Sequence, residues 1–597
     1  MRSSHFLMKT ILAVLCGLFS SSLIAATPCQ DADLLVRNGH IVTMNPAHSS
    51  ASAMAIRDGH ILAVGGDGGL SDCASARTRV IDLQGHTVLP GLIDVHTHAM
   101  EWAKGILRQQ LDLTYPKVHS ISDVVAMVRE RAVETDKGKW IRGAGWDDAK
   151  FSEHRYVTRK DLDAVSPANP VYLVHVSGHL AALNSAALAI AGITRSTPDP
   201  VGGVIEKDDT GEPTGIVKDT IMEHVAELLP PDPSDINKQA AKLISERASA
   251  LGLTTIHDIF ISFDEIRGYQ DAYQQGWLKI RVQMSPRIGG MEDAEKLAQM
   301  GVHTGFGNDH LKFGAAKMFA DGGMGARTIA IYPPPVQGEP GNLGVLRWKP
   351  EDMQKAHLIA ARAGWQLETH AIGDRAIDEV LDSYAATMKA LDLKDPRFRI
   401  VHAGISTPAI QKRMRELHVL VDGNPPFVYW IGSWFNKYGA ERVRWSYPAK
   451  SYINNGIIEA AGSDVPVTPI SPWWGIWSAV VRRDMSTGEV LAPEERLTVL
   501  EALRLYTFNG AYVGFEENDK GSLETGKLAD FIVVDRDVLS VPNDQLKDVQ
   551  VLATYVGGQV VSGSGFVAGT TSRLRSTPSL YIRVKKREGA WLSSARR

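Results

Sequence analysis

The sequence is poor in cysteine and carries no strong excess of charge. Three cysteines in 597 residues exclude a disulfide-rich scaffold. Lysine and arginine number 64 against 68 aspartate and glutamate, giving a net charge of −4, and no long basic run is present. Because such a chain offers no basic surface to match phosphates, nucleic acid is not an expected partner.

The one apolar run that resembles a membrane-directed segment lies at the N-terminus. Arg2 and Lys9 precede apolar residues 11–19, and small residues follow through Ala26. This order is typical of a secretory signal peptide, and the run is short for a membrane span. We therefore predict a signal peptide over residues 1–26, and a secreted or periplasmic protein without a stable span. An uncleaved anchor is the alternative.

Removal of that segment leaves Cys29 and Cys73. In an oxidising compartment these two residues can form a disulfide, and two free buried thiols are the alternative. Without a third sulfur ligand they do not make a cysteine-based zinc site.

Turn-rich β segments at both ends flank a long α/β region. Residues 33–64 have the pattern of two hairpins, and residues 531–534 and 551–561 have the pattern of further strands. We expect one composite β-sandwich domain assembled from residues 27–87 and 516–570. A C-terminal tail, residues 571–597, remains unassigned.

Residues 88–515 alternate short apolar strands with helical stretches, which is typical of an α/β fold with a (β/α)₈ TIM barrel. About 150 residues separate the first two strands, far more than a barrel loop. We expect residues 104–250 to form an inserted domain over the barrel mouth. The expected strands are residues 88–95, 254–258, 280–284, 312–319, 365–370, 398–402, 418–421 and 457–463.

Metal-binding side chains occur where these strands end. His96 and His98 close the first strand, and residues i and i+2 of a strand face the same side. This pair alone is weak evidence in a chain with 19 histidines. Further polar residues lie near the end of the fourth strand, at the ends of the fifth and sixth, and directly after the eighth: Lys317, His370, His402 and Asp464. Barrel active sites lie at these strand ends, and imidazole with carboxylate suits zinc or a similar divalent ion.

Several segments resemble the amidohydrolase superfamily. Residues 89–98 (Leu-Pro-Gly-Leu-Ile-Asp-Val-His-Thr-His) resemble its first-strand signature, Gly462-Ser463-Asp464 its eighth-strand signature, and residues 527–533 its returning β-strand. The branch of YtcJ-like metal-dependent hydrolases (amidohydrolase family 3), which includes N-substituted formamide deformylases, fits best. Its similar segments are residues 140–147, 177–179, 319–322 and 370–376.

The resemblance implies two divalent metal ions, expected to be zinc. It implies these ligands: His96, His98 and Asp464 for the buried ion, and His370 and His402 for the second. Lys317 would bridge the ions as a carboxylated lysine, because an unmodified ammonium only donates hydrogen bonds and repels cations. The alternative is an ammonium paired with Asp321 beside a single ion.

One position departs from the family pattern. The family usually has glutamate directly before the sixth-strand histidine, but Val401 precedes His402 here. Because adjacent strand residues face opposite sides, we expect position 401 to face away from the barrel lumen and His402 to keep its metal.

The expected catalytic residue is Asp464, a general acid and base for metal-activated hydroxide. The expected substrate contacts are His179, Trp146, Asp321 and Arg327, although Asp321 can equally belong to a structural turn.

We therefore expect a hydrolase that cleaves carbon–nitrogen bonds, of the non-peptide amide or N-formyl type, in a small molecule. A homodimer is left open. A single-metal deaminase on the same scaffold and an exported binding protein without catalysis are the alternatives. Such a deaminase usually has His-x-x-Glu after the fifth or sixth strand, and this chain has no such motif there.

Overall fold

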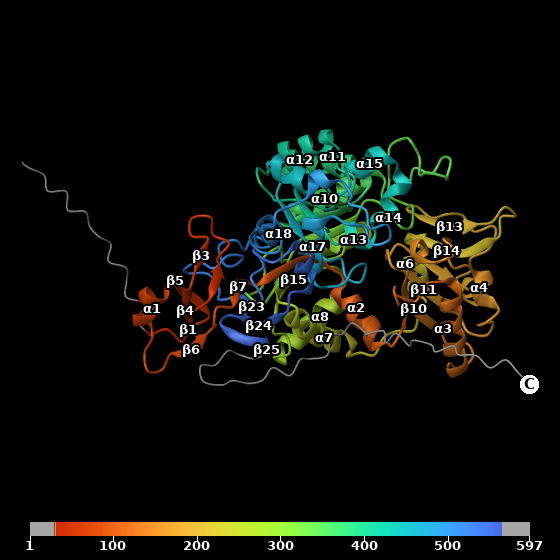
Figure 1. Ribbon diagram of the computed structural model, residues 1–597. Helices are drawn as coiled ribbons and strands as arrows, with labels where there is room; N and C mark the ends of the chain where they lie inside the picture. The colour runs from red at the N-terminus through yellow and green to blue at the C-terminus, as the bar shows by residue number, and fades with distance from the viewer. Residues whose placement is uncertain (1–28, 30, 564–597) are drawn as a thin grey trace, which may run out of the picture.

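The computed structural model describes residue 29 and residues 31–563. The predicted signal peptide, residues 1–26, and the predicted tail, residues 571–597, lie outside the described residues. Figure 1 shows three regions side by side: a β-sandwich on the left, an α/β barrel region in the centre and an inserted domain on the right.

The β-sandwich joins the two ends of the described chain. Its sheets have the strand orders β5-β4-β1-β6 and β25-β24-β23-β7-β2-β3. Val88 of β7 pairs with Val533 of β23 in antiparallel register, so one sheet contains strands from both ends. Side chains such as Val36 and Phe531 share one buried core. The bounds are β1 (Leu34–Arg37), β2 (His40–Val42), β3 (Ser50–Ala51), β4 (Ala53–Arg57), β5 (His60–Gly65), β6 (Arg79–Asp82), β7 (Thr87–Pro90), β23 (Phe531–Val534), β24 (Val551–Val556) and β25 (Gln559–Gly563).

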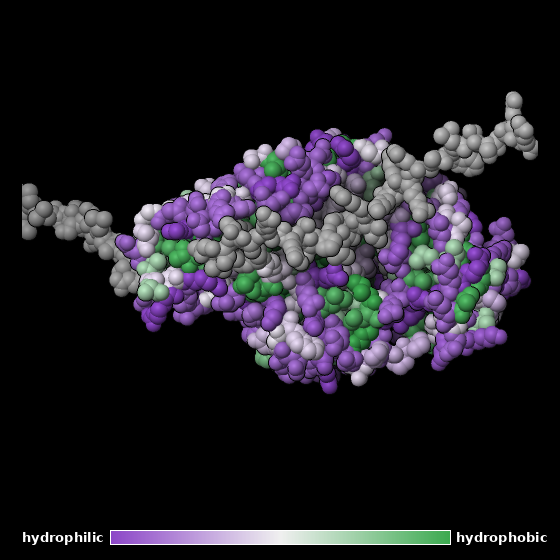
Figure 2. All heavy atoms as spheres, turned by 60° about the horizontal axis from the view of Figure 1, so that its bottom comes forward, coloured by the Kyte–Doolittle hydropathy of each residue, from purple (hydrophilic) through white to green (hydrophobic). Residues whose placement is uncertain are grey.

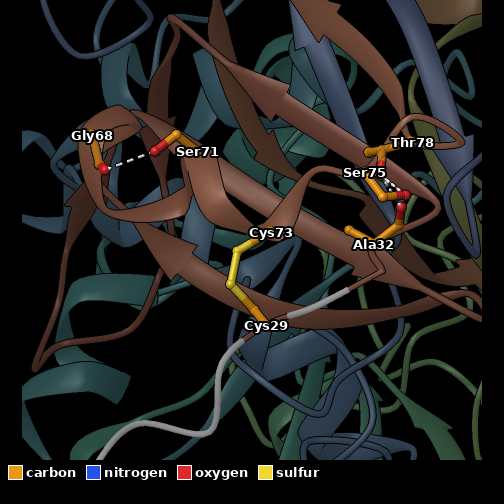
Figure 3. Close-up of a disulfide and its surroundings, with 7 residues drawn as sticks. All are labelled: Cys29, Ala32, Gly68, Ser71, Cys73, Ser75 and Thr78. Carbon is orange, nitrogen blue, oxygen red and sulfur yellow. Dashed lines mark hydrogen bonds between the residues drawn. A yellow bond between two sulfur atoms is a disulfide. The ribbon is translucent and has the colours of Figure 1, made fainter.

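A disulfide fastens the start of the described chain to this sandwich. Cys29 is bonded to Cys73, with Cα atoms 4.7 Å apart, as Figure 3 shows. Beside the bond, the Ala32 N–H donates to the Cys73 carbonyl at 3.1 Å, and the Thr78 hydroxyl donates to the Ala32 carbonyl at 2.6 Å. Of the two alternatives left open by the sequence, the structure contains the paired form.

The barrel region contains two all-parallel sheets, β17-β16-β15-β8 and β18-β19-β20-β21-β22. Two predicted strands are divided. Residues 88–95 split at Gly91, where an added Cβ would lie 2.2 Å from Thr254. The part before Gly91 is β7, which pairs with β23 and β2 and so belongs to the sandwich. Residues 312–319 split into β17 and β18. The bounds are β8 (Leu92–Thr97), β15 (Leu253–Ile261), β16 (Arg281–Pro286), β17 (Leu311–Phe313), β18 (Ala316–Phe319), β19 (Leu367–Ala371), β20 (Arg399–His402), β21 (Leu420–Gly423) and β22 (Glu459–Ala461).

Backbone contacts join the two parallel sheets at both edges. At one edge, residues 311–319 run from β17 into β18, and the Ile288 N–H donates to the Lys317 carbonyl at 2.7 Å. At the other edge, the Asp464 N–H donates to the His96 carbonyl at 2.7 Å. The ends of the first and last strands therefore lie beside each other, which brings residues far apart in the sequence to one place.

Helices cover the outer faces of these sheets, in keeping with the predicted barrel-type α/β fold. Their apolar sides pack on the strands; Ile377 and Leu381 of α11, for example, share a core with Ile400 of β20. The larger helices are α2 (Ala99–Leu107), α7 (Ile236–Ala250), α8 (Phe263–Gln274), α9 (Met291–Gln299), α10 (Pro350–Arg362), α11 (Asp374–Leu391), α12 (Pro408–Glu416), α17 (Pro472–Val481) and α18 (Val499–Leu505).

The inserted domain is built on a mixed sheet with the order β13-β14-β12-β11-β10-β9. Residues 104–250 were too broad a range for it, because α7 places Ala240 and Ile244 in the barrel core. Trp146 and Leu173 lie in a separate core of the insertion. The bounds are β9 (Leu111–Asp112), α3 (Ile121–Glu134), β10 (Ile141–Trp146), α4 (Arg159–Asp163), β11 (Val171–His175), β12 (Leu180–Leu183), α5 (Ser185–Ile190), β13 (Gly203–Lys207), β14 (Pro213–Asp219) and α6 (Thr220–Ala226).

Among the described residues, no helix is long and apolar enough to cross a membrane. Figure 2 shows a face on which hydrophilic residues predominate and hydrophobic residues form separate patches.

Candidate metal centre

His96, His98 and Asp464 lie together at the meeting edge of β8 and β22. His96 Nε2 is 3.1 Å, and His98 Nε2 is 3.4 Å, from Asp464 Oδ1. Asp94 holds this edge, because its Oδ1 accepts hydrogen bonds from the Ser463 N–H at 3.0 Å and from the His96 N–H at 3.1 Å. Potential ligand atoms of these three residues lie within 4.8 Å of one another, as in a metal site.

His370 and His402 continue this group from β19 and β20. The ring centroids of His96 and His402 are 4.7 Å apart, and those of His402 and His370 are 4.6 Å apart. Burial lowers the pKa of all three imidazoles well below the ordinary value, so they are neutral and able to bind a metal.

Hydrogen bonds determine which ring nitrogen of His370 and of His402 is free. His402 Nδ1 donates to Asn424 Oδ1 at 2.6 Å, and Asn424 is oriented by a bond from its Nδ2 to the Gly462 carbonyl at 3.1 Å. His370 Nε2 donates to the Gly322 carbonyl at 3.0 Å. Nε2 of His402 and Nδ1 of His370 therefore remain available as ligand atoms, the arrangement that metal-binding histidines usually show.

Lys317 of β18 is completely buried beside these rings, and its Nζ has no hydrogen-bond partner among the described residues. Burial lowers the pKa of Lys317 to about 8, against the opposing influence of Glu368 and Asp464. Asp321 does not pair with it. The Asp321 carboxylate instead accepts backbone N–H bonds from the loops after β18 and β19: Ala330, Ile372 and Gly373.

The unpartnered atoms at this centre fit bound cations. In the described part of the chain, these buried atoms have no hydrogen bond: both ring nitrogens of His96, Asp464 Oδ1, His370 Nδ1 and Lys317 Nζ. Buried polar atoms are rarely left unsatisfied, and a divalent ion would satisfy the imidazole and carboxylate atoms. Lys317 fits the same ions only after its amine has been converted into an oxygen ligand.

Below the centre, Arg399 forms buried ion pairs with Glu368 and Asp422. Val401 lies two residues further along β20, so it shares the lumen-facing side with Arg399. The prediction that position 401 faces away from the lumen was wrong. The alternation that supported it ends at His402, whose φ of 69° is outside the extended region.

Of the four predicted substrate contacts, His179 and Asp321 lie next to the centre, and Asp321 Oδ1 is 3.4 Å from His370 Nε2. The ring centroid of His179 lies 5.1 Å from that of His370. Trp146 does not lie there: it is 0% exposed in the insertion core, and its indole N–H donates to the Leu173 carbonyl. Asp321 also accepts hydrogen bonds from backbone amides, which fits its alternative role as a turn residue. Arg327 pairs with Asp148 and Glu339.

A second acidic group, Asp147, Asp148 and His175, occurs where the insertion meets the barrel loops. Asp147 pairs with Lys150 at 3.0 Å and Asp148 with Arg327 at 3.3 Å, so both carboxylates already face cations. The Ser177 N–H donates to His175 Nδ1 at 3.1 Å, which leaves the proton of the neutral ring on Nε2. We therefore interpret this group as a set of ion pairs that connects the inserted domain to the barrel loops.

Asn424 and Asp219 are the functional candidates that sequence reasoning missed. Asn424 directly follows β21, where a polar residue at a barrel strand end was a usable signal. Asp219 ends a strand of the insertion, and nothing in the sequence connects it to the barrel.

Comparison with known proteins gives the family. Residues 79–562 match the Amidohydrolase family. YtcJ of Bacillus subtilis (strain 168), an amidohydrolase by name, is 31% identical over 88% of this chain and 98% of its own. N-substituted formamide deformylase of Arthrobacter pascens is 30% identical over 89% and 98%.

Among solved structures, an uncharacterized metal-dependent hydrolase of Pyrococcus horikoshii OT3 is 26% identical, with a TM-score of 0.67 over 86% of this chain and 99% of that one. The resemblance predicted from the motifs is thus confirmed, and so is the barrel-type α/β fold. The chain belongs to the amidohydrolase family and is a metal-dependent hydrolase of the kind that acts on carbon–nitrogen bonds.

Proposed function

We propose that this protein hydrolyses a small N-formyl or other non-peptide amide compound at a binuclear centre, with zinc as the metal. The observation that carries the proposal is the convergence of unpartnered buried atoms from β8, β18, β19 and the segment after β22. The formamide deformylase relative supports an N-formyl substrate.

The ligands divide into two sets. His96, His98 and Asp464 would hold one ion, and His370 Nδ1 and His402 Nε2 the other. Carboxylation of the Lys317 amine would give a carbamate with one oxygen for each ion. A buried amine with a lowered pKa supports this reaction, because the unprotonated form is the one that attacks carbon dioxide.

The bound ions would polarise the substrate carbonyl and lower the pKa of water to about 7. Asp464 Oδ1 lies within 3.4 Å of Nε2 of both first-strand histidines, which supports a role for its carboxylate in taking the proton of the attacking water. It then delivers this proton to the leaving nitrogen, which departs poorly without one. The ring centroids of His402 and Phe427 are 5.6 Å apart and the rings are stacked, so an aromatic side chain packs against the site beside His402.

A hydrolysis screen tests the function. Zinc- and manganese-loaded protein is offered N-formyl and N-acyl compounds, and product acids and amines are quantified. We expect turnover by the wild type, its loss together with bound metal in His96→Ala, and no change in His154→Ala, which alters an exposed histidine. Folded wild-type protein without metal affinity would contradict the proposal. One tightly bound zinc with ammonia release from a nucleobase-like compound would instead indicate the deaminase.

Carboxylation of Lys317 has its own test. Apoprotein is reconstituted with zinc in buffer with bicarbonate and in buffer freed of carbon dioxide. Faster activation with bicarbonate is expected in the wild type. Equal rates in both buffers would favour an unmodified lysine.

We also propose that the protein is exported and folds with one closed eight-stranded barrel. The disulfide between Cys29 and Cys73 supports an oxidising compartment, and the backbone bonds at both sheet edges support closure. Sequencing the N-terminus of protein produced from the full chain tests export. A mature chain starting after Ala26 is expected, and an intact Met1 would contradict it.

A further inference from the structure

His179 and Asp219 form a hydrogen-bonded pair on the inserted domain. His179 Nδ1 lies 2.7 Å from Asp219 Oδ1, and the Asp219 N–H donates to the His179 carbonyl at 2.9 Å. Asp219 is 2% exposed, and its Oδ2 has no hydrogen-bond partner in the described part of the chain. A carboxylate accepts only, so Nδ1 of His179 carries the proton and Nε2 is left for another contact.

The pair lies over the metal centre. The ring of His179 is 5.1 Å from His370 and 5.8 Å from Phe319, measured between centroids. His179 comes from the insertion, whereas its neighbours come from barrel strands.

The barrel and the insertion are shaped to hold this pair. An added Cβ at Gly322 would lie 2.6 Å from Asp219 Oδ2, and one at Gly323 would lie 2.7 Å from the His179 ring. Asp219 has φ 54° and ψ −124°, a conformation that an L residue rarely adopts. Backbone strain of this kind persists where surrounding contacts enforce it, and it concentrates at functional sites.

We propose that Asp219 is a positioning residue that fixes His179 with Nε2 toward the substrate, making the insertion part of the active site. This inference rests on the proposed function. The pair acts as a second layer around the reaction centre: Asp219 sets the tautomer and angle of the ring, and His179 makes the contact. The same carboxylate–imidazole arrangement orients histidines at many metal and catalytic sites.

A double-mutant cycle tests the pairing. Kinetic constants are measured for wild type, His179→Ala, Asp219→Asn and the double variant on the best substrate from the screen. Asparagine is chosen because it tolerates positive φ. Asp219→Asn is expected to lower kcat/KM by about 10–100-fold, and to have no further effect once His179 is alanine. Glu206→Gln, which removes a carboxylate paired with Lys218, the residue before Asp219, is the matched control and should retain wild-type activity.

Two measurements separate positioning from general damage. Metal content, measured by mass spectrometry, should be the same in Asp219→Asn and wild type. With ¹⁵N-labelled histidine, the His179 signal, assigned by its loss in His179→Ala, should show a protonated Nδ1 that changes in Asp219→Gly. An equal loss of kcat/KM with and without His179, or an unchanged His179 signal in Asp219→Gly, would overturn the inference. A wild type that hydrolyses nothing would refute the proposed function, and the ¹⁵N measurement would still decide whether Asp219 sets the tautomer.

Discussion

Asn424 Oδ1 accepts the Nδ1 proton of His402 at 2.6 Å, which turns Nε2 of that ring toward the centre of the barrel mouth. Because such a partner fixes the tautomer of a metal ligand, Asn424→Ala should weaken binding of one ion by about 10–100-fold. Metal titration followed by mass spectrometry checks this. Asn455→Ala, which removes an amide bonded to Gln411, is the control. Unchanged affinity for both ions would contradict the role of Asn424.

Replacement of Asp464 by asparagine should separate metal binding from turnover. Asparagine keeps an oxygen ligand but cannot hold the transferred proton, so kcat should fall by about 100-fold or more while much of the metal stays bound. Steady-state kinetics and metal content are measured on the same preparation. Asp392→Asn, at an exposed helix end, serves as control. Turnover near the wild-type rate would exclude Asp464 as the acid and base.

A buried ion pair fastens the sandwich to the barrel. Arg281 of β16 and Asp530 lie 2.6 Å apart, each 3% exposed. Asp530→Ala leaves a buried guanidinium unpaired and should lower the free energy of unfolding by about 3–5 kcal/mol. Asp548→Ala removes the partner of a more exposed pair with Lys547 and should cost about 0–1 kcal/mol. Urea unfolding measures the loss of unfolding free energy in both variants. Equal losses would show that the buried pair stabilises the protein no more than the exposed one.

The stability of the sandwich should depend on the bond between Cys29 and Cys73. Loss of a cross-link that closes a loop between residues 44 positions apart should cost about 2–4 kcal/mol. Thermal unfolding of wild type with and without reductant, and of Cys29→Ser with Cys73→Ser, checks this. Reductant should lower the wild-type midpoint and leave the double variant unchanged. A wild type indifferent to reductant would argue against the cross-link.

Glu516 gives a prediction for acid stability. Burial alone would raise the pKa of Glu516. The pKa is nevertheless lowered to about 2, because the Nζ atoms of Lys520 and Lys312 each lie 2.7 Å from the Glu516 carboxylate. A depressed folded pKa contributes stability that is complete above the unfolded value, about 4.5, and is lost as pH falls through the folded value. The stability difference between wild type and Glu516→Gln should therefore shrink from pH 4.5 to pH 2. Denaturant unfolding at several pH values measures it, and a constant difference would refute the assignment.

The grouping of the proposed metal ligands was predictable because each lies at or near the end of an apolar strand, and the family resemblance implied the role of each. His96 and His98 needed only the two-residue alternation of β8. The same rule failed at Val401, because His402 leaves the extended conformation at the strand end. Strand ends at a catalytic rim are where regular geometry stops, so alternation arguments are weakest there.

Contacts across domains could not be predicted from sequence spacing. Trp146 and His179 both belong to the insertion, yet one is in its core and the other lies over the barrel. Only the docked arrangement of the two domains distinguishes them. Asp219 was missed for the same reason, since its relation to the centre depends on how the inserted sheet lies against Gly322 and Gly323.

The pairing of Val88 with Val533 has a consequence for biosynthesis. Strand β7 leaves the ribosome early but has its partner β23 only after the inserted domain and the whole barrel region have been made. A nascent chain must therefore keep an unpaired strand edge during most of its synthesis, a state prone to association with other chains. Truncation before residue 531 should then yield aggregated protein, even though every proposed metal ligand is retained.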